Sequence, residues 1–113
     1  MGNPKWHTPL SDFEDGLAQS DTPFFLGLSH GSMEVELYRP AGEDLQTPHT
    51  RDELYIVQQG SGTFMRGEEE IAFAPGSAIF VPAKMDHRFT QFTEDFETWV
   101  VFWGPEGGER DAD

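Results

Sequence analysis

Short runs of alternating or continuous hydrophobic residues follow one another along most of the chain, and glycine or proline separates them. The run over 33–39 is the clearest, because Met33 and Val35 fall on one face while the acidic Glu34 and Glu36 fall on the other. The remaining runs cover residues 24–28, 53–59, 62–66, 69–73, 78–81, 87–92 and 98–103. Eight short runs at this spacing, without a long helical pattern, predict an all-β barrel or sandwich.

Both ends of the chain lack this periodicity. Residues 1–22 contain prolines, a glycine and scattered acidic residues, which predict an irregular N-terminal arm with at most a short helical turn. Residues 105–113 are rich in glycine and charge and predict a disordered C-terminal tail. Since 113 residues suffice for one domain with its own core, we place a single barrel domain at 23–104.

The last predicted strand is hydrophobic on both faces. Residues 99–103 are two tryptophans, two valines and a phenylalanine. A strand that is apolar on both faces is buried on both, either by two layers of one domain or by a second subunit. Together with the N-terminal arm, which could cross to a neighbouring copy, this strand favours a homodimer.

The composition narrows the classes of function. The chain carries 21 acidic and 7 basic residues, a net charge of −14, which repels nucleic acid and anionic membrane surfaces. It has no cysteine, which excludes disulfides, thiolate ligands and a cysteine nucleophile. No hydrophobic run approaches the length of a membrane span. We therefore expect no nucleic-acid partner, no membrane insertion and a cytoplasmic location.

Two strand entrances carry side chains that could hold a metal ion. His49 and Glu53 are four residues apart, so both can point to the same face of one strand. By the same alternation His87, Phe89 and Gln91 share one face of a later strand. Imidazole nitrogen and carboxylate oxygen are common ligands of divalent metals, and a His–Glu–His set leaves open positions for water or substrate. The plainer alternatives are a polar pair at a strand end and a hydrogen-bonded pocket histidine.

The spacing within these segments resembles the paired motifs of the cupin superfamily. In the first segment His49, three intervening residues, Glu53, six intervening residues and Gly60 match the second half of the first motif. In the second segment a glycine, five residues, Pro82 and then His87 follow in the order of the second motif. The two segments cover about half of the chain, and the strand pattern outside them agrees with the same fold.

Three positions depart from the motifs. Thr47 stands where the first motif has its first histidine, Lys84 replaces a glycine, and Gln91 stands at the position of an asparagine. The family's usual ligand set of three histidines and one glutamate is thereby reduced by one imidazole. We expect this loss to weaken metal binding without abolishing it, because three protein ligands plus water are a common arrangement.

The resemblance implies a double-stranded β-helix, or jelly-roll barrel, with a metal near the mouth of its lumen. The implied ligands are His49, Glu53 and His87, and the divalent ion would be Fe, Mn, Ni, Zn or Cu. The lumen would hold a small-molecule ligand. The residues expected to contact it are Thr47, Tyr55, Phe89 and Gln91.

Two classes of function remain open on this basis. The first is a metalloenzyme that acts on a small organic molecule, for example a dioxygenase or an isomerase. The second is a non-catalytic barrel that binds or senses a small ligand, with weak metal binding or none. The fold alone does not choose between them, because one fold hosts many unrelated chemistries.

Overall fold

The computed structural model describes residues 6–110, and this part of the chain forms one helix and eight strands. The helix α1 spans Leu10–Ala18. The strands are β1 (Phe24–His30), β2 (Met33–Tyr38), β3 (Asp52–Gln59), β4 (Gly62–Arg66), β5 (Glu69–Phe73), β6 (Ala78–Val81), β7 (His87–Thr90) and β8 (Glu97–Trp103). Each of the eight strands overlaps one of the eight hydrophobic runs, with bounds that differ by up to two residues, and the all-β fold class is confirmed.

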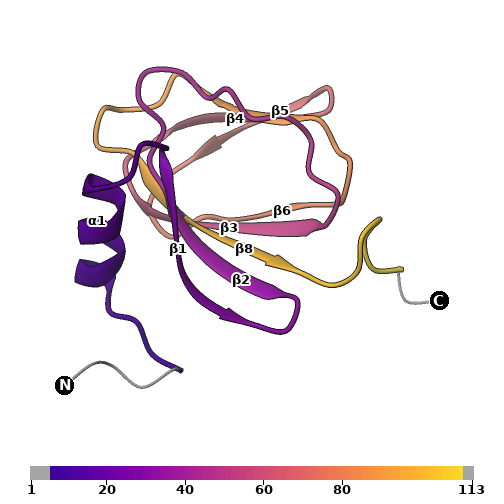
Figure 1. Ribbon diagram of the computed structural model, residues 1–113. Coiled ribbons are helices and arrows are strands. Elements are labelled where there is room, and N and C mark those ends of the chain that lie inside the picture. Colours follow the sequence, from indigo (N-terminus) through magenta and orange to yellow (C-terminus); the bar gives the residue numbers. More distant parts are fainter. Residues whose placement is uncertain (1–5, 111–113) are drawn as a thin grey trace.

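The strands form two antiparallel sheets that face each other and close a jelly-roll barrel (Figure 1). The larger sheet has the order β1-β2-β8-β3-β6, and the smaller has the order β5-β4-β7. Strand β8 lies between β2 and β3 in the middle of the larger sheet. This central position explains why β8 is hydrophobic on both faces, because one face lines the barrel interior and the other lies partly under α1.

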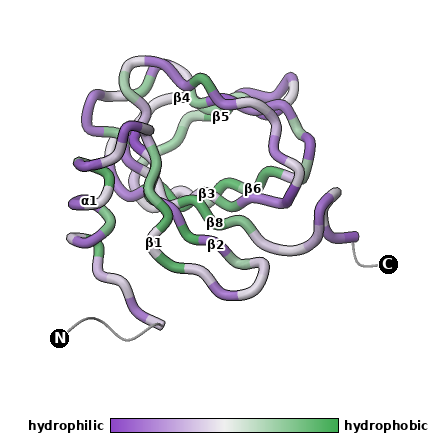
Figure 2. The backbone as a smooth tube through the Cα atoms, in the orientation of Figure 1, coloured by the Kyte–Doolittle hydropathy of each residue, from purple (hydrophilic) through white to green (hydrophobic). Residues whose placement is uncertain are grey.

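Aromatic side chains fill much of the barrel interior. Phe89 lies at the centre of this cluster, with ring centroids 4.6 Å from Phe64, 4.7 Å from Phe96 and 4.8 Å from Tyr55. The buried cluster consists of Tyr38, Tyr55, Val57, Phe64, Phe73, Ile79, Val81, Phe89, Phe96, Val100 and Phe102. Figure 2 shows the hydrophobic residues along the strands and the hydrophilic ones mainly at the connections. Burial of these rings supplies the main driving force for folding.

The alternation predicted for β2 is present, and its acidic face turns into the barrel. Glu34 pairs with Phe102 of β8, which in turn pairs with Glu53 of β3, so these three residues form one row on the inner face. Glu36 belongs to the next inner row, beside Val100. The acidic side chains of β2 therefore face the same interior as Glu53.

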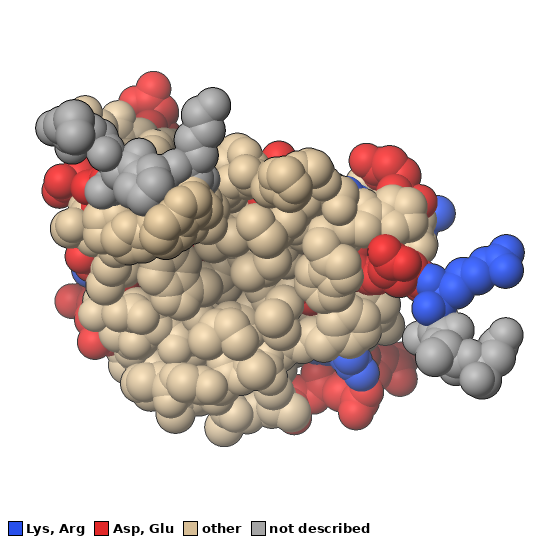
Figure 3. Space-filling view, turned by 90° about the horizontal axis from the view of Figure 1, so that it is seen from below, with Lys and Arg blue, Asp and Glu red and all other residues tan. Residues whose placement is uncertain are grey.

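The outer face of the larger sheet is correspondingly apolar. Leu28, Val35, Val101, Leu54 and Phe80 form one row across all five strands. Figure 3, seen from the side of this sheet, shows a broad surface without charged side chains and with acidic and basic residues at its rim. Such a surface is unusual for a chain with a net charge of −14.

The prediction of an irregular N-terminal arm is wrong for residues 10–18, which form α1. Phe13 is the buried residue of this helix, and its ring packs edge-on against Phe25 and Trp99 on the outer face of the sheet. The apolar residues of 10–18 recur at helical spacing, and this pattern is short enough to be hidden by the surrounding acids and prolines. A helix forms here because it covers an apolar sheet face.

Two glycines allow α1 to approach the sheet closely. A Cβ atom at Gly16 would lie 2.4 Å from the ring of Phe25, and one at Gly27 would lie 2.3 Å from the ring of Phe13. Gly27 also sits at a register shift of β1 against β2, as expected for a β-bulge. Any larger side chain at either position would push the helix away from the sheet.

The prediction of a disordered C-terminal tail is wrong for residues 105–110, and residues 111–113 lie outside the described part. The backbone N–H of Gly107 donates to the carbonyl of Thr50 over 2.6 Å, and that of Glu109 donates to Asp52 Oδ2 over 2.8 Å. Asp52 also accepts a hydrogen bond from the N–H of Ala83. A buried carboxylate thus anchors the tail, which composition alone could not show.

Among the described residues no helix is long and apolar enough to cross a membrane.

Candidate metal centre

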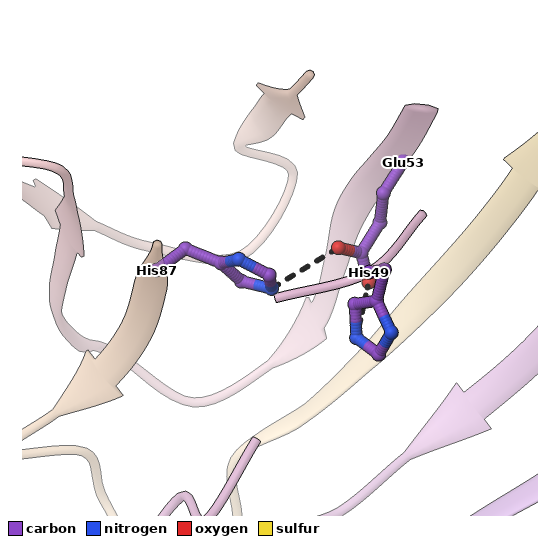
Figure 4. Close-up of side chains that lie close together, drawn as sticks. All are labelled: His49, Glu53 and His87. Atoms are coloured by element: carbon purple, nitrogen blue, oxygen red, sulfur yellow. Dashed lines mark ion pairs between the residues drawn. The ribbon is translucent and has the colours of Figure 1, made fainter. Parts of the chain in front are cut away.

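The structure brings His49, Glu53 and His87 together, as the spacing predicted. His49 lies in the loop between β2 and β3, Glu53 near the start of β3, and His87 at the first residue of β7. Figure 4 shows the two imidazoles on either side of the Glu53 carboxylate. His87 Nε2 lies 3.1 Å from Glu53 Oε1, and His49 Nε2 lies 3.8 Å from Glu53 Oε2. One candidate ligand atom from each residue lies within 4.8 Å of the others.

The buried atoms of this group lack hydrogen-bond partners. Glu53 is 1 % exposed and His87 is 4 % exposed. Within residues 6–110, neither oxygen of Glu53 nor Nε2 of His87 makes a hydrogen bond of good geometry. A buried carboxylate without partners is strongly unfavourable. A divalent cation would satisfy all three atoms, so the donor set fits a metal ion.

His87 is held in the orientation that a ligand needs. Its Nδ1–H donates to the carbonyl of Met85 over 2.8 Å, which leaves the Nε2 lone pair facing Glu53. A lone pair opposite a carboxylate is stable only with a proton or a cation between them. Burial lowers the pKa of His87, but the contact with Glu53 and the bond to Met85 outweigh it and raise that pKa overall.

His49 differs from His87 in its electrostatics. Burial is the largest influence and lowers the pKa of the His49 imidazole, while the nearby Glu53 opposes this effect only in part. An imidazole with a lowered pKa is neutral near pH 7 and therefore ready to bind a metal. The backbone of His49 is held by the segment that carries the second motif, because the N–H of Lys84 donates to the carbonyl of His49 over 2.6 Å.

Lys84 occupies a strained backbone position in that contact. Its φ is +68°, in the left-handed region where glycine is favoured. The glycine of the second cupin motif falls at this position, so the departure noted in the sequence is a substitution at a site that needs positive φ. The turn keeps its shape nonetheless and still supports His49.

A buried carboxylate that no sequence pattern singled out organises the loop before His49. Asp44 is 1 % exposed and accepts hydrogen bonds from the hydroxyl of Tyr38 over 2.6 Å and from the N–H of Phe89 over 2.9 Å. It also accepts from the backbone N–H and the side-chain Nε2 of Gln46. Asp44 therefore ties the loop to strands of both sheets.

Gln46 connects this carboxylate to the metal group. Its Oε1 accepts a hydrogen bond from the hydroxyl of Tyr55 over 2.9 Å and lies 3.1 Å from His49 Nε2. Neither Asp44 nor Gln46 belongs to a periodic run or to the matched part of a motif. The only available signal was their position between two strands, just before the histidine.

A pocket of about 820 Å³ opens beside the group. His49 and Glu53 are among its lining residues, together with Glu34, Glu36 and Arg51. Arg51 donates to Glu34 and to the carbonyl of Ser32, so its charge is already paired. Burial, with the nearby Glu34 and Glu53 adding to it, raises the pKa of Glu36 to about 7. Within the described residues the side chain of Glu36 makes no ion pair or hydrogen bond, although the charge of Arg51 lowers its pKa slightly.

The four residues expected to contact a small molecule lie in different environments. Thr47 is exposed and lines the pocket. Tyr55 is fully buried with its hydroxyl on Gln46, and Phe89 belongs to the hydrophobic core rather than to the pocket wall. The placement of Gln91 on the lumen face is wrong, because β7 ends at residue 90 and Gln91 is exposed in a turn with φ +48°.

The fold and the site define a class of protein: a small jelly-roll barrel with two histidines and a glutamate at the mouth of its lumen. A family model for the cupin domain matches residues 34–103, and the chain therefore belongs to the cupin family. The resemblance drawn from the two motifs is confirmed.

Individual proteins that resemble this chain agree with the fold and assign it no activity. The chain is 37 % identical over 99 residues to an uncharacterized protein of Streptomyces coelicolor, covering 86 % of this chain and 94 % of that one. The structure is similar to that of TT1209 from Thermus thermophilus, with a TM-score of 0.67, 22 % identity, and coverage of 87 % and 96 %. It is also similar to that of DMSP lyase DddQ from Ruegeria pomeroyi, with a TM-score of 0.62, 21 % identity, and coverage of 72 % and 46 %. The last two likenesses show the fold alone.

Proposed function

We propose that this cupin binds a divalent metal on His49, Glu53 and His87 and acts on a small organic molecule held in the adjoining pocket. The observation that carries the proposal is the buried Glu53 carboxylate, which faces two imidazoles and has no hydrogen-bond partner within residues 6–110. The pocket beside it, of about 820 Å³, is of a size that holds a small ligand.

When bound, the metal would supply a Lewis acid that polarises an oxygen of the ligand. The residues of this chain then have separate tasks. The carbonyl of Met85 fixes the ring of His87, and the backbone of Lys84 fixes the loop of His49. The Arg51–Glu34 pair forms part of the pocket wall near Phe102.

Glu36 favours proton-transfer chemistry, as in an isomerase, over oxygen chemistry. Glu36 lines the same pocket as Glu53, in the neighbouring inner row, and within the described residues its side chain makes no ion pair or hydrogen bond. In the metal-free protein the pKa of Glu36 is about 7, mainly because the group is buried, and a carboxyl group in this range can both give and take a proton near neutral pH. One structural neighbour is a DMSP lyase, so this fold serves in at least one enzyme that is named a lyase.

The test is elemental analysis of the protein purified without added metal, compared with two variants. We expect a near-stoichiometric divalent metal in the wild type and its loss in His87→Ala. His30→Ala, which removes an exposed histidine at the end of β1, is the matched control and should retain the metal. A metal-free wild type that holds an organic ligand in the pocket would contradict the proposal and support a non-catalytic binding barrel.

A further inference from the structure

We propose that the side-chain oxygen of Gln46 is a further ligand of the metal and replaces the imidazole that Thr47 does not provide. This inference rests on the proposed function, because it concerns the same metal ion. It differs in naming a residue that stands outside the matched motif positions. The structure places Gln46 against His49, whereas the neighbouring Thr47 is exposed on the pocket wall.

The orientation of the Gln46 amide is fixed by its neighbours. Its Nε2 donates to Asp44 Oδ2 over 2.9 Å, and an ionised carboxylate can only accept. The amide oxygen must therefore point the other way, where the hydroxyl of Tyr55 donates to it over 2.9 Å. With one end held by an acceptor and the other by a donor, a flipped amide would lose both bonds.

The amide oxygen faces the same imidazole nitrogen as the Glu53 carboxylate. His49 Nε2 lies 3.1 Å from Gln46 Oε1 and 3.8 Å from Glu53 Oε2. Because both oxygens are acceptors, Nε2 carries the proton in this arrangement. A metal ion bound to Nε2 would replace that proton. It would then face both the Glu53 carboxylate and the Gln46 amide oxygen, so the amide oxygen is placed to coordinate it.

The chemistry of the ligand set changes accordingly. Two imidazole nitrogens with a carboxylate and an amide oxygen form a harder set than three imidazoles with one carboxylate. Oxygen ligands of this kind suit Mn²⁺ better than they suit Cu²⁺ or Zn²⁺. Mn²⁺ is therefore the probe with which the contribution of Gln46 should be clearest.

The competing explanation is that Gln46 only orients His49 through their contact. A positioning role and a ligand role both predict weaker binding after substitution, but only a ligand lies within bonding distance of the metal. The test therefore needs a direct structural measurement beside the affinity.

The experiment uses the whole chain and Mn²⁺, with affinity measured by competition against a fluorescent chelator. We expect Gln46→Ala to weaken Mn²⁺ binding by at least about tenfold. Gln46→Met, which keeps the length of the side chain but replaces the hard oxygen by a thioether, should do the same. Both variants lose the side-chain hydrogen bonds to Asp44 and Tyr55, so their affinities are measured well below their melting temperatures, where circular dichroism shows them folded. Thr47→Ala is the matched control and should bind Mn²⁺ within about twofold of the wild type, since exposed side chains contribute little.

A crystal structure of the Mn²⁺-loaded wild type completes the test. We expect Gln46 Oε1 within about 2.2 Å of the ion, as for other oxygen ligands. Unchanged affinity in both Gln46 variants, or an ion bonded to His49, Glu53 and His87 with Gln46 Oε1 out of bonding distance, would overturn the inference and leave the proposed function intact. A wild type that binds Mn²⁺ no better than His87→Ala would overturn both.

Discussion

Replacement of Asp44 by asparagine should unfold the protein under conditions in which the wild type is stable. Asp44 is buried and accepts four hydrogen bonds, two on each oxygen. Asparagine can keep an oxygen toward Tyr38 and the backbone of Gln46. Its amide NH₂ then faces the side-chain Nε2 of Gln46 and the N–H of Phe89, which are both donors. Two hydrogen bonds are therefore lost. The two donors that made them, Gln46 Nε2 and the N–H of Phe89, now face the NH₂ group of the asparagine, which is also a donor.

The size of the effect follows from these lost contacts. A hydrogen bond to a charged group contributes about 1.5–3 kcal/mol, and a buried donor without a partner is further destabilising. Two such losses amount to about 3–6 kcal/mol, against a total stability of about 5–15 kcal/mol for a domain of this kind. At about 4–8 °C per kcal/mol, the melting temperature of Asp44→Asn should fall by about 15 °C or more.

Equilibrium unfolding in urea, followed by tryptophan fluorescence, measures this loss. The matched control is Asp95→Asn, because Asp95 is exposed and accepts one side-chain hydrogen bond, from Thr93. We expect the control to unfold within about 1 kcal/mol of the wild type. If Asp44→Asn also unfolds within about 1 kcal/mol of the wild type, then Asp44 does not hold the loop to the barrel as argued above.

Three further predictions concern other parts of the molecule. Lys84→Gly relieves a φ of +68° and should stabilise the protein by about 1 kcal/mol in thermal unfolding, whereas Lys84→Ala, which keeps the strain, should change little. The pKa of Glu36 is about 7 in the folded protein and 4.5 without the fold, so stability of the metal-free protein should fall as pH rises through that interval. Glu36→Gln should show a smaller loss of stability over this pH interval, measured as the difference between melting temperatures below and above it. An equal loss in the wild type and the variant would contradict the raised pKa of Glu36. We also propose that the uncharged outer face packs against a second copy, because a net charge of −14 disfavours contact through charged faces. Light scattering should give a dimer that Val101→Glu converts to a monomer, and a monomeric wild type at micromolar concentration would refute it.

The sequence alone correctly predicted the position of a site residue when its side chain belongs to a strand with strict alternation of two faces. Glu53 and His87 are examples, because the alternation of β3 and the spacing of the motifs both place them on the inner face. The period misled at Gln91, since β7 ends one residue earlier and the next residue adopts a left-handed conformation. A strand end is set by backbone hydrogen bonds with other strands, which one segment of sequence does not contain.

The helix and the loop show a second limit. Phe13 becomes buried only because the outer face of β1 and β8 offers Phe25 and Trp99 as partners, so α1 depends on tertiary contacts. Asp44 and Gln46 likewise acquire their roles from residues on other strands. Polar residues in a loop without period are typical of solvent-exposed turns, and only the folded chain distinguishes a buried network from such a turn.

The inward-facing acids of β2 also bear on how folding and metal binding are linked. Glu34 forms an ion pair with Arg51, which acts on Glu36 only as the smallest influence on its pKa. Within the described residues Glu53 faces only the two imidazoles. Placing such groups in a barrel interior opposes folding unless a proton or a cation compensates them. A divalent metal would neutralise Glu53 and make the potential at Glu36 less negative, and it binds only when both sheets are in place. The metal should therefore stabilise the fold by mass action, so a chain selected to hold it can keep acidic groups in its interior.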